Sequence, residues 1–219
     1  MKKRLIIILI ASVVGILLIL LAYNIIKFKS IEKKEALYYR EKAYEYLYEK
    51  YGKEATFLND GTYYDSVYFY SMYFENEDRN FQVRAIPSAS SFSDDYILRL
   101  LDWEVSELIE NICHKYYTDV DCTTHIIHNI DDEEMLEPYY RNQQSLIFGI
   151  QPDNKINVDI NIYQDNNMPD QKNFHLILEE LNELDFTVDE IEFCLYNYKC
   201  KLQRSQEYKK MNGDYQIVN

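Results

Sequence analysis

The stretch Leu5–Ile26, LIIILIASVVGILLILLAYNII, contains no charged residue and restricts what this chain can fold into more than any other feature. As an α-helix, its 22 residues would span about 33 Å, close to the roughly 30 Å hydrocarbon core of a bilayer. A helix also satisfies its own backbone hydrogen bonds, which lipid cannot do. The sequence therefore predicts a transmembrane helix. In this interpretation residues 1–29 form an anchor, and residues 5–26 contact the lipid bilayer.

A cleaved signal peptide is the alternative interpretation of this stretch. Its apolar region would usually span about 7–15 residues and end in a small-x-small cleavage site. Here the apolar run is longer, and its only candidate cleavage site, Leu20-Leu21-Ala22, fits the small-x-small pattern poorly. We therefore expect an uncleaved single-pass anchor.

The orientation of the anchor is less directly indicated by the sequence. Basic residues flank both ends of the apolar run, so the positive-inside count does not decide the orientation. Signal anchors that begin with a few basic residues usually keep their amino terminus inside the cell and export the chain that follows the apolar run. By analogy, we expect the soluble part of this protein to be extracytoplasmic. The opposite orientation would place the soluble part in the cytoplasm.

Charge is unevenly distributed along the chain. All 37 Asp and Glu residues lie beyond Lys29, together with 18 of the 23 Lys and Arg residues, so this part carries a formal charge of −19. Such a surface repels phosphate backbones, and we expect no nucleic-acid partner. Solubility is the simplest explanation of the acidic surplus, and attraction of cations or of a basic partner is the alternative.

Beyond the anchor, the pattern predicts strands that alternate with amphipathic helices. Helices are expected over residues 31–51, from an N-cap at Ser93 to about Lys115, and over residues 171–185. Gly52 is expected to end the first of these helices. Strands are expected at Tyr63–Phe74, Phe81–Ile86, Cys122–Ile130 and Lys155–Tyr163, and the last strand or strand pair at Glu190–Leu202. A short helix or loop is expected to open at residues 131–134 and to be interrupted by Pro138.

Both halves of this region contain a hairpin whose second strand leads into an amphipathic helix. A sheet with one apolar face is most simply covered by such helices, which predicts an α+β fold. We expect two small α+β domains, residues 30–118 and 119–204, each an antiparallel sheet covered by helices. Residues 205–219 are expected to form a polar tail. A single sheet shared by both halves is the alternative.

Four cysteines are the candidate disulfide residues: Cys113, Cys122, Cys194 and Cys200. An even number in an exported domain permits disulfides, and four cysteines allow three connectivities. Cys113 and Cys122 are close in sequence, across a predicted helix end. Cys194 and Cys200 would lie about 20 Å apart on one straight strand, so they can pair only if the chain turns back near Asn197.

No motif in the sequence predicts a catalytic or metal site. The spacing of Cys113, Cys122 and three nearby histidines (His114, His125 and His128) matches no common zinc pattern, and the acidic clusters near Asp119 and Asp131 lack the glycine of a calcium loop. Nucleophile elbows, Gly-rich phosphate loops and His-Glu-x-x-His are absent from the sequence. We therefore expect no cofactor and no metal, and lean against an enzyme.

A row of tyrosines is the most unusual local feature, and it is a candidate binding face. The row consists of Tyr63, Tyr64, Tyr68, Tyr70 and Tyr73. Tyrosine favours strands and is enriched at interfaces, because it combines a rigid apolar body with a polar tip. Cross-strand packing within a sheet is the alternative explanation.

Parts of this chain resemble the YfjL-like group of small membrane-anchored proteins from Gram-positive bacteria. The resemblance rests on Ala43–Gly52 (AYEYLYEKYG), the strands at Tyr63–Phe74 and Phe81–Ile86, and the two-part layout behind one anchor. It implies a bacterial envelope setting and a division into amino-terminal and carboxy-terminal domains. The group is of unknown function, so the resemblance implies no site residues.

These observations lead to two functional hypotheses. The first is a membrane-anchored extracytoplasmic protein that serves as a binding or interaction module at the bacterial cell envelope. The second is an envelope hydrolase whose site is assembled from distant residues. A deep pocket with converging carboxylates, or a Cys–His pair, would favour the hydrolase, whereas an aromatic patch larger than a few hundred Å² would favour binding.

Overall fold

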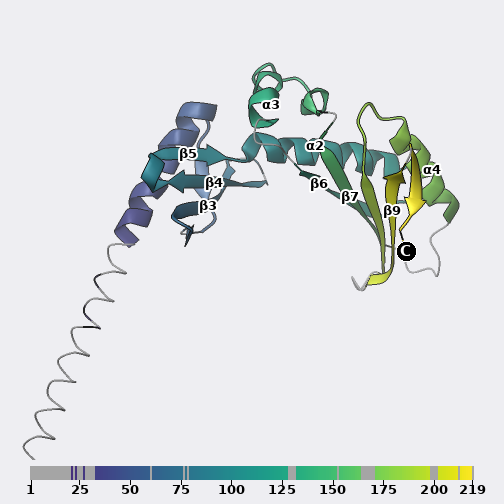
Figure 1. Ribbon diagram of the computed structural model, residues 1–219, viewed down its shortest axis with the longest axis horizontal. Coiled ribbons are helices and arrows are strands. Elements are labelled where there is room, and N and C mark those ends of the chain that lie inside the picture. Colours follow the sequence, from purple (N-terminus) through teal and green to yellow (C-terminus); the bar gives the residue numbers. More distant parts are fainter. Residues whose placement is uncertain are drawn as a thin grey trace, which may run out of the picture. The chain divides into compact units, whose positions relative to one another are not determined.

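The computed structural model describes residues 21, 23, 27, 33–59, 61–75, 77, 79–127, 132–151, 153–163, 171–197, 202–211 and 213–218 (Figure 1). The chain divides into two compact units, a first unit at Met1–Asp94 and a second unit at Asp95–Asn219. Each unit contains a five-stranded sheet and at least one helix. The predicted α+β fold class is therefore confirmed.

The sheet of the first unit is antiparallel throughout the described residues. Its central strands pair in the order β1-β3-β4-β5, and β2 pairs with the half of β3 that β1 leaves open. The strands are β1 (Ala55–Phe57), β2 (Thr62–Tyr64), β3 (Val67–Phe74), β4 (Asn80–Ile86) and β5 (Ser91–Asp94).

One helix, described over residues 33–51, covers a single face of this sheet (Figure 1). Burial alternates strictly along β3 and β4, because successive strand residues point to opposite faces. The buried set faces the helix, in which Ala43 and Leu47 are fully buried. Tyr68 of β3 stacks on Tyr39 of the helix, and Phe74 lies edge to face with Tyr51. The helix ends where the sequence predicts, at Gly52, whose φ of +66° suits glycine and whose N–H donates to the Tyr48 carbonyl at 2.8 Å.

The single strand predicted at Tyr63–Phe74 is wrong, because β2 and β3 are separate strands. Asp65 and Ser66 lie between them with φ values of 47° and 65°. Two consecutive residues with positive φ are typical of a type I′ hairpin turn, which reverses the chain within two residues. The sequence gives a weak signal here, because apolar and aromatic residues continue on both sides of the turn.

The predicted N-cap at Ser93 is also wrong. Ser93 lies in β5, paired with Arg84 of β4, and the next helix begins at Tyr96. The sheet ladder fixes the backbone of this residue in an extended conformation, which overrides its local preference for capping a helix.

The second unit contains five strands, three α-helices and a 3₁₀ turn within its described residues. These are α2 (Tyr96–Cys113), β6 (Val120–Ile127), α3 (Asp132–Arg141), η2 (Leu146–Gly149), β7 (Lys155–Tyr163), α4 (Gln171–Asn182), β8 (Glu190–Tyr196), β9 (Leu202–Met211) and β10 (Asp214–Ile217). The strand order is β10-β9-β8-β7-β6. The strand predicted at Lys155–Tyr163 is confirmed with the same bounds.

The sheet of the second unit is mixed, which corrects the prediction of a purely antiparallel sheet. β7 and β8 run parallel, and the other neighbouring pairs run antiparallel. A parallel pair needs a crossover connection, and α4 lies between these two strands in the chain. On the covered face, the Phe174 ring of α4 stacks on the Phe193 ring of β8 with centroids 4.1 Å apart.

The position of α2 changes the predicted domain boundary. The sequence places a boundary between residues 118 and 119, which assigns α2 to the first domain. The compact units divide between Asp94 and Asp95 instead, and α2 packs along β6 of the second unit. Ser106 of α2, for example, accepts a hydrogen bond from the Thr124 N–H at 3.0 Å.

Two further expectations about this unit are wrong. The predicted polar tail at residues 205–219 contains most of β9 and all of β10, and the Tyr215 hydroxyl donates to the Val188 carbonyl at 3.0 Å. Pro138, expected to interrupt a helix, lies inside α3.

Among the described residues, no helix is both long enough and apolar enough to cross a membrane. Of the predicted anchor segment, residues 5–26, only Leu21 and Tyr23 are described. The transmembrane prediction therefore lies almost entirely outside the described residues and stays a prediction.

Candidate functional site

The five tyrosines predicted to form a binding face do not lie on one surface. Tyr68 and Tyr70 point inward and are 3% and 0% exposed, while Tyr73 lies on the opposite face of β3 and is half-buried. Only Tyr63 and Tyr64 of β2 are well exposed, at 49% and 73%. The period-two alternation of a strand separates the row into core and surface residues.

A series of ring contacts connects the exposed Tyr63 to the helix. Tyr63 packs on Tyr68 with ring centroids 4.7 Å apart, and Tyr68 stacks on Tyr39 of the helix at 5.5 Å. Tyr39 in turn contacts Tyr38 edge to face at 5.2 Å. Aromatic side chains from β2 and from the helix thus meet at one end of the first unit.

The exposed residues at this end form what we call the aromatic surface, defined as Leu37, Tyr38 and Tyr63. Leu37 and Tyr38 are 48% and 54% exposed. Tyr63 belongs to β2, in which all three residues are exposed. Tyr64, the next residue, pairs with Val67 and points to the opposite face of the sheet, so it is not part of this surface. Large rigid rings held by buried neighbours lose little entropy when a ligand covers them, which suits them to recognition.

A groove of about 500 Å³ adjoins the aromatic surface and shares Leu37 with it. The groove is open to solvent, and its lining residues are Leu37, Arg40, Glu41, Tyr44, Glu45 and Phe57. The Arg40 guanidinium lies 4.4 Å from the centroid of the Phe57 ring, in cation–π geometry. Phe57 also packs on Tyr70 at 5.7 Å, so the groove and the aromatic surface rest on the same core.

The chemistry of this end of the first unit favours binding of a ligand with both apolar and polar groups. The rings offer flat apolar faces, and Arg40, Glu41 and Glu45 offer a cation and two carboxylates. Reasoning from the sequence missed Arg40 and Phe57 as part of a site. The helical spacing of Leu37, Glu41 and Tyr44 places them on one face of the helix, but nothing in the sequence places β1 beside that face.

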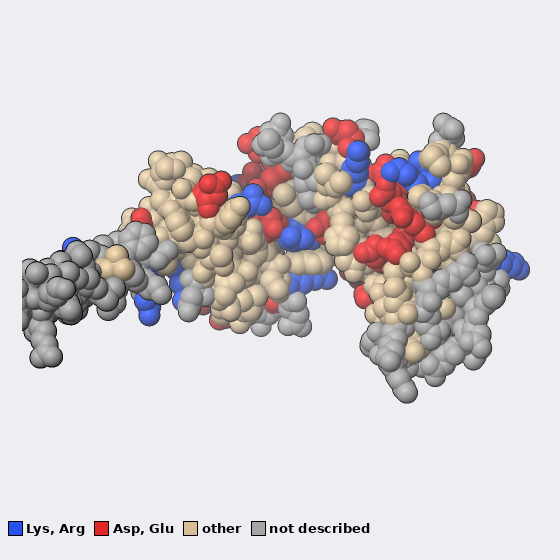
Figure 2. Space-filling model, turned by 60° about the horizontal axis from the view of Figure 1, so that its bottom comes forward, with Lys and Arg blue, Asp and Glu red and all other residues tan. Residues whose placement is uncertain are grey.

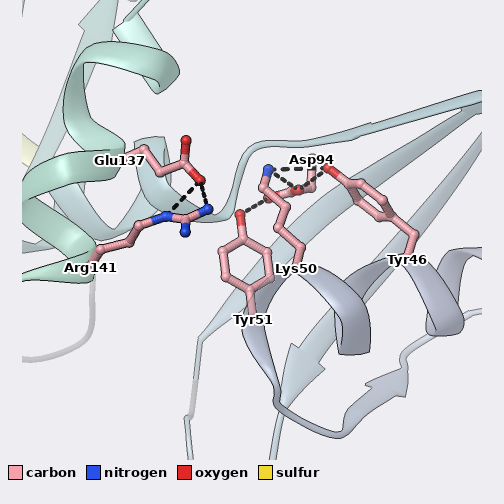
Figure 3. A network of polar contacts seen from close by, with 6 residues as sticks. All are labelled: Tyr46, Lys50, Tyr51, Asp94, Glu137 and Arg141. Carbon is pink, nitrogen blue, oxygen red and sulfur yellow. Dashed lines mark hydrogen bonds and ion pairs between the residues drawn. The ribbon is translucent and has the colours of Figure 1, made fainter.

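A second polar cluster of the first unit ties the helix to the sheet edge (Figure 3). Asp94 ends β5 on the covered face and accepts three hydrogen bonds, from the Tyr46 hydroxyl at 2.7 Å, the Tyr51 hydroxyl at 2.7 Å and the Lys50 ammonium at 2.9 Å. Burial, and then the Asp94 charge, raise the pKa of Tyr46, so its hydroxyl stays a donor. Both carboxylate oxygens are occupied, which indicates a structural role.

The candidate disulfide residues are distributed over the second unit. Cys113 and Cys122 are both buried, with their sulfur atoms 3.9 Å apart. Cys194 is also buried, on β8. Burial, together with the nearby Glu192 charge, raises the pKa of Cys194 to about 11. Cys200 lies outside the described residues.

The uncovered face of the sheet in the second unit is acidic. Asp159, Glu192 and Glu207 are directly paired neighbours on β7, β8 and β9, and Figure 2 shows acidic side chains gathered on the right-hand unit. His125 lies beside this row, with its Nε2 3.6 Å from Asp159. Nowhere in the described ranges do three His, Cys, Asp or Glu side chains converge to hold a metal ion. The row is typical of a solvated sheet face that repels anions.

Comparisons with known proteins add little to this geometry. No family model matches the chain, and no curated protein matches it. A similar solved structure is the crystal structure of a DUF5037 family protein from Ruminococcus gnavus ATCC 29149 at 2.55 Å resolution. The two share 18% sequence identity, and the match covers 71% of this chain and 73% of the other at a TM-score of 0.46. A TM-score of this size supports no functional assignment.

Proposed function

We propose that this protein is a membrane-anchored interaction module of the bacterial cell envelope. Residues 5–26 cross the lipid bilayer, and the two α+β units lie on the extracytoplasmic side. The aromatic surface and the adjoining groove bind a partner, a protein segment or an envelope glycan. The observation that carries this proposal is the exposure of Leu37, Tyr38 and Tyr63 beside a groove that contains Arg40.

The anchor is supported by the length and composition of the apolar run. Leu21 and Tyr23, its two described residues, are 60% and 63% exposed. Apolar side chains that the protein leaves uncovered are accommodated by lipid. The resemblance to the YfjL-like group supports the same envelope setting.

Binding is favoured over hydrolysis by the form of the groove. A hydrolase site is usually a deep pocket with carboxylates that converge from different elements. The two carboxylates of this groove, Glu41 and Glu45, lie one turn apart on the same helix, and the groove is open. Tyrosine and arginine are enriched in the energetically important residues of interfaces.

Site-specific photocrosslinking in intact cells tests the proposed function. Tyr63 is replaced by p-benzoylphenylalanine, a photoreactive aromatic residue, in the full-length chain. Phe148 of the second unit provides the control, because it is a more exposed aromatic residue, at 72% against 49% for Tyr63, and should react at least as readily by chance. The expected result is a discrete adduct from position 63 that is absent from position 148.

Dependence on the groove distinguishes recognition from chance proximity. Arg40→Ala and Leu37→Ser, introduced separately into the chain that carries the probe at position 63, should each weaken the adduct at least several-fold. Equal adducts from positions 63 and 148, or an adduct that neither substitution changes, would overturn the aromatic surface as the binding site.

A further inference from the structure

Two buried thiols of the second unit face each other across its main packing interface. Cys113 is the last residue of α2 and Cys122 lies on β6, nine residues later in the chain. Their sulfur atoms are 3.9 Å apart, and the residues are 0% and 6% exposed. A disulfide requires about 2.05 Å between the sulfur atoms, so a small rotation of each side chain brings them to bonding distance.

The two backbones that carry these thiols are held in place by several hydrogen bonds. The Tyr116 and Tyr117 N–H groups both donate to the Cys113 carbonyl, at 2.9 and 3.0 Å, and fix the chain after α2. Elsewhere on the same interface, the Ser106 hydroxyl of α2 accepts from the Thr124 N–H of β6 at 3.0 Å. The thiols therefore stay adjacent for as long as α2 remains packed on β6.

The sheet geometry excludes Cys194 as a partner for either residue. Cys122 alternates with Thr124 on the face that α2 covers. On β8, Phe193 points to that covered face and stacks on Phe174 of α4. Because successive strand residues point to opposite faces, Cys194 lies on the other side of the sheet. Two of the three possible connectivities are excluded in this way.

We propose that Cys113 and Cys122 form an intramolecular disulfide that joins the end of α2 to β6. The inference rests on the proposed extracytoplasmic location, where disulfides persist. In the balanced reaction, one protein thiolate attacks a disulfide oxidant and releases one oxidant thiol. The second protein thiolate then displaces the other oxidant thiol, forming the Cys113–Cys122 bond. The protein thiols are oxidised, and the oxidant disulfide is reduced to two thiols.

The folded dithiol resists this reaction once α2 and β6 have packed. The hydrogen bond to the Cys113 sulfur, and burial, raise the pKa of the Cys122 thiol far above its usual range. A protonated and buried thiol is a poor nucleophile. The bond therefore forms while the chain folds, before β6 closes over α2.

Refolding of the full-length protein in detergent with a glutathione redox buffer tests the pairing. Trypsin cleaves after Lys115, between the two cysteines, so the bond joins two tryptic peptides that mass spectrometry of the unreduced digest identifies. We expect this linked pair in the wild type and in Cys194→Ala, and its loss in Cys113→Ala. The oxidised protein should melt about 5–10 °C above the reduced protein. Thiols at both positions, or linkage of either residue to Cys194 or Cys200, would overturn the pairing.

Thiol trapping in intact cells separates this inference from the proposed location. Acid quenching followed by alkylation should find Cys113 and Cys122 protected until a reductant is added. A bond that forms in the refolded protein but is absent in cells would overturn both the native disulfide and the extracytoplasmic location. Failure to form the bond in the glutathione buffer would overturn the pairing alone and would leave the location standing.

Discussion

The Lys50 ammonium lies 2.9 Å from a carboxylate oxygen of Asp94, whose side chain is completely buried. Lys50 belongs to the last turn of the helix, and Asp94 to the edge strand β5. A buried carboxylate is stable only when it is paired and hydrogen-bonded, and here two tyrosine hydroxyls complete its shell. The contact fixes the helix against the sheet edge and so positions the other end of the same helix, which carries Leu37 and Tyr38.

Removing the carboxylate charge should destabilise the first unit. We expect Asp94→Ala to reduce the free energy of unfolding by about 2–3 kcal/mol, because Lys50 and two hydroxyls lose their acceptor. Urea denaturation followed by far-ultraviolet circular dichroism measures this change. Glu45→Gln, which breaks the exposed ion pair with Lys42, is the control and should leave the midpoint unchanged. Equal effects of the two substitutions would contradict the assigned role of Asp94.

Two glycines of the first unit should respond differently to alanine. Gly61 has a φ of +87°, and a Cβ added there would lie 2.5 Å from a Tyr70 ring carbon, so we expect Gly61→Ala to cost at least about 2–3 kcal/mol. Gly52 has a φ of +66° with open space around it, and Gly52→Ala should cost about 1 kcal/mol. Thermal unfolding of the two variants compares the costs, and the reverse order would show that Tyr70 does not lie against Gly61.

The tyrosines of the β2–β3 hairpin should separate into two classes of stability effect. Tyr68→Ala removes a core ring and should cost about 3–5 kcal/mol. Tyr64→Ala changes an exposed side chain and should stay within about 0.5 kcal/mol. Denaturant midpoints of both variants test the assignment. A large loss of stability for Tyr64→Ala would place this residue in the core and contradict its exposed position on β2.

A salt bridge in the second unit predicts a pH dependence with a defined sign. Hydrogen bonds from Lys115 and Tyr116 lower the pKa of Glu180 below its usual 4.5. A lowered folded-state pKa stabilises the fold above the unfolded pKa, and this stabilisation is lost as the pH falls through the folded value. Glu180→Gln should therefore be less stable than the wild type at pH 7, by about 0.5 kcal/mol, and the difference should vanish well below pH 4.

Melting curves of the wild type and Glu180→Gln between pH 3 and pH 7 measure this effect. His175 and Glu179 lie on the same helix, and Glu179→Gln serves as the control because Glu179 is 61% exposed. A constant difference between Glu180→Gln and the wild type across this range would contradict the linkage.

The strongest sequence patterns predicted the matching elements well. The strict alternation in Lys155–Tyr163 predicted β7 with the correct bounds, because one face of that strand is buried under helices and the other is partly exposed to solvent. The helix stop at Gly52 was predicted because few residues other than glycine adopt its backbone conformation readily. Where a local signal and the tertiary requirement agree, the sequence is sufficient.

The elements that were missed depend on contacts between distant residues. Among the described side chains of β9, only Tyr208 has an exposed fraction below a tenth, so the alternation along this strand is weak. The pairing of β9 with β8 decides its structure. Ser93 carries the chemistry of a helix cap, yet the β4 ladder holds it in a strand. Partner strands were not identifiable from local sequence.

In the candidate site, too, the sequence predicted local features but not contacts between distant residues. The sequence identified the tyrosine row but not the turn at Asp65 and Ser66, which places Tyr63 and Tyr64 on a separate edge strand. It also left three cysteine connectivities open. Only the packing of α2 on β6 brings Cys113 and Cys122 together.

The side of the membrane on which Asn219 lies is the most direct test of the proposed envelope role. Alkaline phosphatase, which is active only outside the cytoplasm, and a fluorescent protein that matures in the cytoplasm are each fused after Asn219 of the full-length chain. An extracytoplasmic soluble part predicts an active phosphatase and a dark fluorescent protein, both in the membrane fraction after a carbonate wash. A bright fluorescent protein with an inactive phosphatase, or release of the fusions by the wash, would contradict it.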